Sequence, residues 1–169
     1  MNFFNLIKKR SSIRSFTDRP VAEDDVEKLL RAANSAPSAG NLQAYEIIVV
    51  KKDELKEGLA DEAHGQKFIE QAEAIFAFLQ DAERSKDKYG ERGYLYSIQD
   101  GTIAATFLQL AAVELGLGSC WVGAFDEEGI KEQLGTSKKP LTIIPVGYPS
   151  KSSGSNSPRR ELDDLVTYI

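Results

Sequence analysis

The sequence predicts an α+β fold in which one sheet is covered by helices. Tyr45–Lys51 is an almost unbroken apolar and β-branched run, as expected for a buried strand. Ala22–Ala36 places apolar residues at the i, i+3, i+4, i+7 spacing of an amphipathic helix. Gln99–Leu115 is apolar nearly all round, which predicts a central buried helix. The 169 residues are enough for one such domain, which we expect to span residues 1–169.

The rest of the N-terminal half contains a helix, a strand and a polar stretch. Pro37 ends the first helix, because proline cannot continue it. Asp53–Ala63 is a charged helix with two leucines on one side, and Ala74–Leu79 is a second apolar strand. Ser85–Gly93 is polar and contains glycine, so we expect a mobile loop there.

The C-terminal half adds two strands and a helix. Ser119–Val122 is a short strand that follows the glycines ending the central helix. Glu127–Leu134 is a helix that Asp126 can cap. Leu141–Tyr148 is the last strand, and its Pro145 lacks a donor for the sheet ladder. We therefore expect Pro145 to lie at a sheet edge or at a bulge.

The chain ends in a tail that looks separate from the core. Lys151–Pro158 is a linker rich in serine and glycine. Arg159–Ile169 follows and carries several apolar residues beyond that linker. A tail of this kind has too little chain to pack on itself, so we expect a dimer partner to receive it.

Composition excludes several classes of function. The hydrophobic content of 41% and the charged content of 28% are typical of a soluble globular protein. The net charge of −5 argues against nucleic-acid binding, which needs a basic face. Cys120 is the only cysteine, so no intrachain disulfide forms and the chain suits the cytoplasm. Met1–Lys8 is too short for a signal peptide, and no apolar run approaches the roughly 20 residues of a membrane span.

The usual catalytic sets are missing from the sequence. His64 is the only histidine, and it lies in a charged segment far along the chain from Cys120. A Cys/His nucleophile pair is therefore disfavoured, and one His with one Cys makes a zinc site improbable. Gly116–Trp121 lacks the third glycine of a dinucleotide fingerprint and follows a helix. We expect no metal and name no catalytic residue.

A cationic cluster near the N-terminus suits a phosphate. Arg10 and Arg14 are four residues apart, which puts them on one side of a helical turn or tight loop. One guanidinium group can donate hydrogen bonds to two phosphate oxygens at once, and the hydroxyls of Ser11 and Ser12 can supply further hydrogen bonds to the phosphate. The alternative is a solvated helix end.

A second basic pair, Arg159 and Arg160, stands near the other end of the chain. If the two ends of the chain meet, three or four cations converge on one spot. In an acidic protein this would be a specific anion site and not a general positive field.

Two other segments suit a flat polar heterocycle. Ser38, Asn41 and Gln43 precede the first strand, and the amides of Asn41 and Gln43 match the N3, O2 and O4 edge of a flavin ring. In Gly118–Ala124, small residues flank Trp121, and a backbone N–H there could face flavin N5. The alternatives are an ordinary turn and a core strand with glycines for packing. Together with the cations, these segments point to a bound nucleotide-like cofactor, and we expect a flavin.

The chain resembles the short form of the FMN-dependent nitroreductase family. Four blocks carry the resemblance, and they follow in the family's order along nearly the whole chain. The first is similar to the family's R-x-S-x-R-x-F, and the second to its A-P-S-x-x-N-x-Q. The third is similar to the family's central helix and following strand, and the fourth to its C-terminal end. The blocks are Arg10–Phe16, Ala36–Gln43, Ile98–Gly123, and Pro145–Pro149 with Pro158–Leu162.

The resemblance implies a central, mostly antiparallel sheet flanked by helices, and a homodimer that holds FMN between its subunits and exchanges the C-terminal tail. Arg10, Ser12, Arg14 and Arg159 would hold the phosphate and ribityl chain. The Ser38–Gln43 segment would come from the other subunit, and Gly123 would face N5. The candidate cofactor-binding residues are Arg10, Ser11, Ser12, Arg14, Pro37, Ser38, Asn41, Gln43, Trp121, Val122, Gly123, Ala124, Arg159 and Arg160.

The resemblance also implies a reaction in two halves. NADH or NADPH would give hydride to flavin N5, and a quinone, a nitroaromatic or a similar small acceptor would then take it. Two other uses of the same scaffold stay open. One is a module that holds flavin without turnover, and the other is a relative that degrades flavin or removes a halogen from an aromatic substrate.

Overall fold

A four-stranded antiparallel sheet forms the centre of the protein. The computed structural model describes residues 2–150 and 157–169. The strands, in their order across the sheet, are β1 (Tyr45–Val50), β2 (Ala74–Gln80), β4 (Pro140–Gly147) and β3 (Gly118–Ser119). All three neighbouring pairs are antiparallel. The α+β class and the antiparallel sheet are therefore confirmed.

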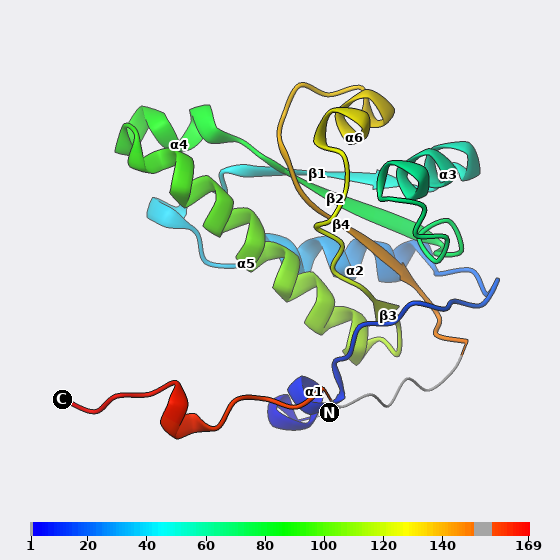
Figure 1. Cartoon of the computed structure of the whole chain (residues 1–169), viewed down its shortest axis with the longest axis horizontal. Helices are drawn as coiled ribbons and strands as arrows, with labels where there is room; N and C mark the ends of the chain where they lie inside the picture. The colour runs from blue at the N-terminus through cyan, green and yellow to red at the C-terminus, as the bar shows by residue number, and fades with distance from the viewer. Residues whose placement is uncertain (1, 151–156) are drawn as a thin grey trace.

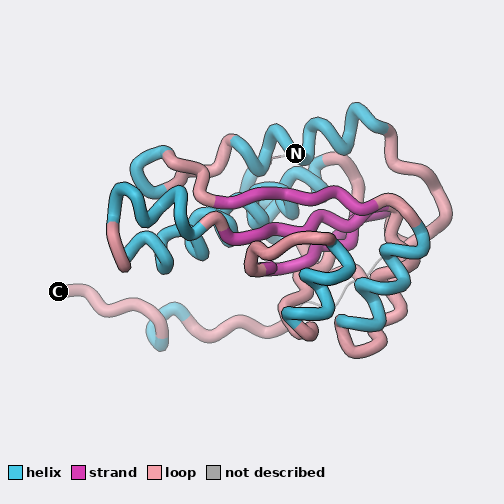
Figure 2. Tube along the Cα trace, turned by 90° about the horizontal axis from the view of Figure 1, so that it is seen from above, coloured by secondary structure: helices cyan, strands magenta, loops and turns pink. Residues whose placement is uncertain are grey.

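Helices cover both faces of this sheet (Figures 1 and 2). The four that pack on it are α2 (Glu23–Asn34), α5 (Arg92–Glu114), α3 (Asp53–Glu62) and α6 (Glu127–Leu134). In β2, Phe76 and Phe78 pack in the core shared with α2 and α5, whereas Ile75 and Ala77 pack in the core shared with α3 and α6. Because both faces are buried, β2 is a continuous apolar run and not an alternating one.

Most elements begin and end within a few residues of the predicted bounds. α6 also has the predicted cap, because the Asp126 side chain accepts a hydrogen bond from Gly129 N at 2.7 Å. It ends at Gly135, whose φ of +63° is left-handed and suits glycine. A short helix that the sequence pattern did not predict, α1 (Phe3–Lys9), precedes the sheet and is capped by Asn2.

The predicted mobile loop at Ser85–Gly93 is wrong, because helix α4 (Ala82–Tyr89) and the start of α5 occupy it. Asp81 caps α4, and Ser85 is fully buried. The two helices approach so closely that a β-carbon at Gly93 would lie 2.5 Å from Lys86 N. Tertiary packing therefore makes helical a segment whose composition alone favours a loop.

Pro145 lies neither at a sheet edge nor at a bulge, so that prediction is also wrong. β4 runs between β2 and β3, and Pro145 stands in register opposite Ile75. Its carbonyl accepts from Cys120 N at 3.3 Å, so its backbone polar groups face β3. The missing N–H of the proline falls just past the end of β3 at Ser119, so the pairing is interrupted there and resumes as an isolated bridge between Val122 and Ile143.

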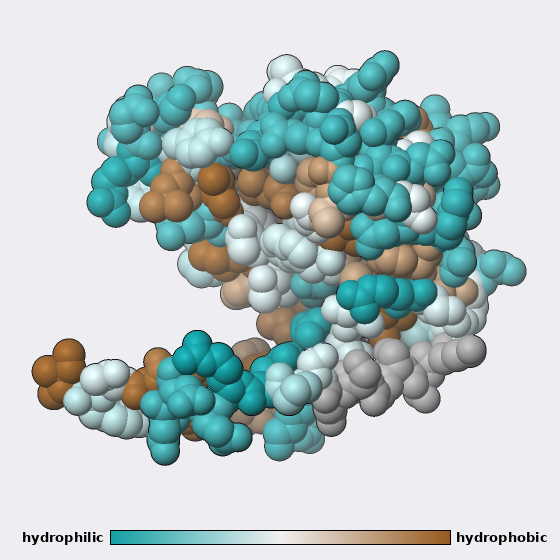
Figure 3. Space-filling view, in the orientation of Figure 1, coloured by the Kyte–Doolittle hydropathy of each residue, from teal (hydrophilic) through white to brown (hydrophobic). Residues whose placement is uncertain are grey.

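The C-terminal tail extends away from the rest of the protein. Residues 157–169 begin beside α1 and hold one short turn, Leu162–Asp164 (Figure 1). Every residue of the tail is exposed, and its apolar side chains project into open space (Figure 3). The predicted linker, Lys151–Pro158, lies outside the described residues except for its last two positions.

Candidate functional site

The segment from Arg10 to Arg14 is extended and runs beside β3. Ser12 forms a parallel bridge with Ser119, and Ile13 N donates to Ser119 O at 2.9 Å. Extended residues alternate in direction, so Ile13 is buried while its neighbours Ser12 and Arg14 are exposed. The prediction of a helical turn or tight loop here is wrong. Arg10 and Arg14 lie on the same side of the segment because every second side chain of an extended chain points the same way.

These residues line a hollow of about 720 Å³ together with the start of the C-terminal tail. Its lining residues are Ile7, Lys8, Arg10, Ser11, Ser12, Arg14, Ser157 and Arg159. The two ends of the chain therefore meet, as predicted, and the described residues of the lining include four cations and no carboxylate. Lys8 was missed, because α1 was not predicted. Arg160 is not part of the lining; its guanidinium donates to the backbone of Asp164 within the tail.

The second predicted group, Ser38, Asn41 and Gln43, forms a hydrogen-bonded cluster. Ser38 Oγ accepts from both Gln43 N and Gln43 Nε2 at 3.0 Å. Gln43 Nε2 also donates to Asn41 Oδ1 at 2.7 Å. Asn41 and Gln43 have φ of +60° and +46°, which is uncommon outside glycine. The loop is held in a tight, specific shape that presents these side chains together.

A buried carboxylate that sequence reasoning missed anchors this loop to α5. Asp100 is only 2% exposed, and its two oxygens accept from Ala39 N at 2.8 Å and from Ala44 N at 3.4 Å. A buried carboxylate is costly unless it is hydrogen-bonded, and here two backbone N–H groups supply those bonds. The available indication was an aspartate within an otherwise apolar helical run.

The loop borders a second hollow, of about 630 Å³, against α5. Pro37 and Ser38 line it, whereas Asn41 and Gln43 do not. The second hollow shares no lining residue with the first.

Helix α5 contacts residues beside both hollows. Asp100 contacts the loop of the second hollow, and Gln109 Nε2 lies 3.4 Å from Ser119 Oγ beside the first. These two contacts are nine helical steps apart, a distance of about 13.5 Å along the axis.

Two of the residues Trp121–Ala124 are available to a ligand. Val122 exchanges both backbone hydrogen bonds with Ile143, each at 3.1 Å, so its N–H belongs to the sheet. Trp121 is half-buried and packs on the core of α2 and α5. Gly123 and Ala124 are exposed, and Gln66 Nε2 lies 3.4 Å from Ala124 O. Contact of Gly123 with a flavin stays a prediction.

Cys120 and His64 do not form a catalytic pair. Cys120 is buried, and burial raises the pKa of its thiol, although the charge of Arg14 partly opposes this shift. His64 is exposed in the turn after α3. Within residues 2–150 and 157–169, no three His, Cys, Asp or Glu side chains gather as metal ligands would. No helix in the same residues has the length and apolar character to cross a bilayer.

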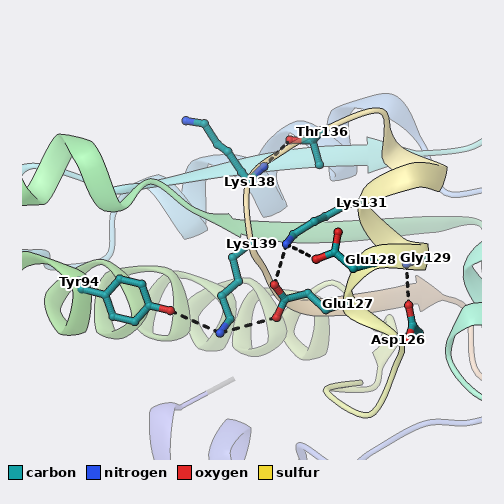
Figure 4. Close-up of polar contacts among 9 residues, drawn as sticks. All are labelled: Tyr94, Asp126, Glu127, Glu128, Gly129, Lys131, Thr136, Lys138 and Lys139. Atoms are coloured by element: carbon teal, nitrogen blue, oxygen red, sulfur yellow. Dashed lines mark hydrogen bonds and ion pairs between the residues drawn. The ribbon is translucent and has the colours of Figure 1, made fainter.

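A polar cluster ties α6 to the start of α5 and lies outside both hollows (Figure 4). Lys139 Nζ lies 3.5 Å from the Tyr94 hydroxyl and 3.6 Å from a Glu127 carboxylate oxygen. Lys131 Nζ lies 2.8 Å from Glu127. This hydrogen bond from Lys131 lowers the pKa of Glu127. The cluster links α5, α6 and the loop that leads into β4.

Comparisons with known proteins agree with this architecture. The sequence model of the nitroreductase family matches residues 7–74 and 61–148. A Bacillus subtilis protein named FMN reductase (NADPH) is 31% identical over 90% of this chain and 68% of its own. A Staphylococcus aureus NADPH-dependent oxidoreductase is 30% identical over 96% of this chain and 71% of its own. The solved nitroreductase NfrA1 of B. subtilis has a TM-score of 0.91 at 28% identity, over 98% of this chain and 73% of its own. The chain belongs to the nitroreductase family.

Proposed function

We propose that the protein is an FMN-dependent oxidoreductase that takes hydride from NADH or NADPH and passes it to a small acceptor such as a quinone or a nitroaromatic. The observation that supports this most is the convergence of Arg10, Arg14 and Arg159 on one hollow in a protein of net charge −5. The names of two relatives, which mention FMN reduction and NADPH, support it further.

The residues present fit the phosphate of FMN. Arg10, Arg14 and Arg159 would bind its oxygens, and the Ser12 hydroxyl would donate or accept beside them. The pairing of Ser12 with Ser119 holds this segment against the sheet, so the cations need little rearrangement to bind. When bound, FMN supplies the hydride chemistry at N5, and the protein supplies position and electrostatics. Gly123 would present its backbone N–H to the ring.

A homodimer would complete the site. The loop with Ser38, Asn41 and Gln43 lines a different hollow from the cations, so we assign it to the flavin held by the partner subunit. Unpartnered apolar side chains on α1, α5 and the tail support this arrangement. They include Phe3, Phe4, Leu95, Phe107, Leu162 and Leu165. We assign the exposed tail to the surface of the partner.

An absorbance spectrum tests the cofactor, and anaerobic reduction tests the reaction. Protein purified or reconstituted with FMN is expected to show the visible bands of bound flavin and to lose them under NADH or NADPH. If the protein does not bind FMN, the proposed function is wrong. If bound FMN stays oxidised with both nicotinamides, the protein holds flavin without this turnover.

A further inference from the structure

Two cations lie on tyrosine rings where α4 meets α5. Lys88 Nζ lies 5.5 Å from the centroid of the Tyr89 ring. Arg92 lies 5.4 Å from the centroid of the Tyr96 ring, and its Nε donates to the Tyr96 hydroxyl at 2.9 Å. The two tyrosine rings pack edge to face with centroids 5.0 Å apart. We call these four residues the cationic rim.

The cationic rim borders the loop of the second hollow. A β-carbon at Gly40 would lie 2.7 Å from Lys88 Nζ and would collide with the Tyr89 hydroxyl. Tyr96 itself lines the hollow that Ser38 also lines. Lys88 therefore stands beside the loop to which we assign the flavin ring, Arg92 contacts Tyr96 of the second hollow, and neither cation lines the hollow of Arg10 and Arg14.

The charges of the cationic rim are not neutralised by carboxylates. In the described part of the chain, neither Lys88 nor Arg92 lies within ion-pair distance of an acid, although Asp87 and Glu91 are their neighbours in sequence. Lys86, on the same helix, differs, because Glu83 holds its ammonium at 3.2 Å. Both rim cations are exposed, so an arriving anion can reach them without displacing a carboxylate.

We propose that Lys88 and Arg92 bind an anionic group on the substrate that meets the flavin, and so set substrate preference. This inference rests on the proposed function. The anion is a phosphate or a similar group, because guanidinium and ammonium donors bind such oxygens strongly. Two sources share this chemistry: the 2′-phosphate that distinguishes NADPH from NADH, and an acidic substituent on the electron acceptor.

Steady-state kinetics of the FMN-loaded enzyme separates the two sources. Lys88→Gln and Arg92→Gln would be compared with wild type, with NADPH against NADH, and with a sulfonated naphthoquinone against an uncharged one. Lys86→Gln is the matched control, since Glu83 already holds that ammonium. We expect KM to rise about tenfold for either NADPH or the sulfonated quinone, whichever carries the recognised anion, while KM for its partner without that group stays unchanged. Lys88→Arg, which keeps the charge, is expected to retain most of the preference.

Calorimetry gives a readout that does not depend on turnover. If NADPH is the source, adenosine 2′,5′-bisphosphate binds the oxidised holoenzyme more tightly than AMP, and Lys88→Gln removes that difference. If only the sulfonated quinone responds to the variants, the acceptor is the source.

Equal KM values in the rim variants and the Lys86→Gln control would overturn the inference. So would equal KM increases for the substrates with and without the 2′-phosphate or sulfonate, because these indicate a structural role. A wild-type enzyme that neither nicotinamide reduces would refute the proposed function instead, and the binding of the bisphosphate would still test the rim.

Discussion

Asp100 Oδ1 accepts a hydrogen bond from Ala39 N at 2.8 Å, across 61 residues of sequence. Replacing Asp100 with alanine would leave the N–H groups of Ala39 and Ala44 without this acceptor. We expect Asp100→Ala to lower the free energy of unfolding by about 2 kcal/mol or more, measured by urea denaturation. Asp87→Ala, at an exposed site, is the control and should change it by less than about 0.5 kcal/mol. If both variants behave alike, the carboxylate does not hold the loop.

Arg14→Ala tests the cationic hollow. We expect FMN to bind about 10- to 100-fold more weakly, because a charge-assisted hydrogen bond to the phosphate is lost. The fold should persist, since Arg14 is exposed and its neighbour Ile13 keeps its place in the core. Titration of flavin fluorescence measures the affinity. Arg31→Ala, on the surface of α2, is the control, and equal affinity in Arg14→Ala and wild type would exclude Arg14 from the site.

The apolar tail gives a prediction about assembly. Leu162 and Leu165 are 72% and 57% exposed, so the double replacement with aspartate costs the single chain little. We expect this variant to sediment as a monomer or a weaker dimer and to lose FMN affinity, because a charged tail cannot bury against a partner. Analytical ultracentrifugation measures the state. A dimer of undiminished stability would show that the tail is not exchanged.

Glu127 gives a prediction about pH. Its pKa in the folded protein lies below the ordinary value of 4.5, so its ion pair stabilises the fold above that pH and is lost as the pH falls through the folded pKa. Because the side chain is 39% exposed, we expect Glu127→Gln to cost only about 0.5 kcal/mol near neutral pH. The difference from wild type should vanish once the pH falls below the lowered folded-state pKa of Glu127, because its carboxyl group is then protonated. Glu132→Gln is the control on the same helix, and a difference that grows in acid would contradict this account.

The strands and most helices could be predicted because their apolar spacing reflects burial. The Ser85–Gly93 segment could not, since its helix depends on Ser85 packing against α5, and no local pattern encodes that contact. Pro145 is similar, because it is tolerated inside the sheet only where the short β3 has ended.

The candidate site was predictable in residue type more than in geometry. The meeting of Arg10 and Arg14 with Arg159 is confirmed, although an extended segment and not a turn presents the two N-terminal arginines. The role of Asp100 could not be predicted, because the sequence does not show which distant backbone groups its carboxylate binds.

Helix α5 imposes a strict spacing on the protein. Inserting one residue between Asp100 and Gln109 would turn one of their contacts by about 100° relative to the other and shift it by about 1.5 Å. Asp100 and Gln109 could then no longer contact the Ser38–Gln43 loop and β3 at the same time. This stretch of α5 can therefore accept changes of side chain, but a change of length would misalign everything attached to its two ends.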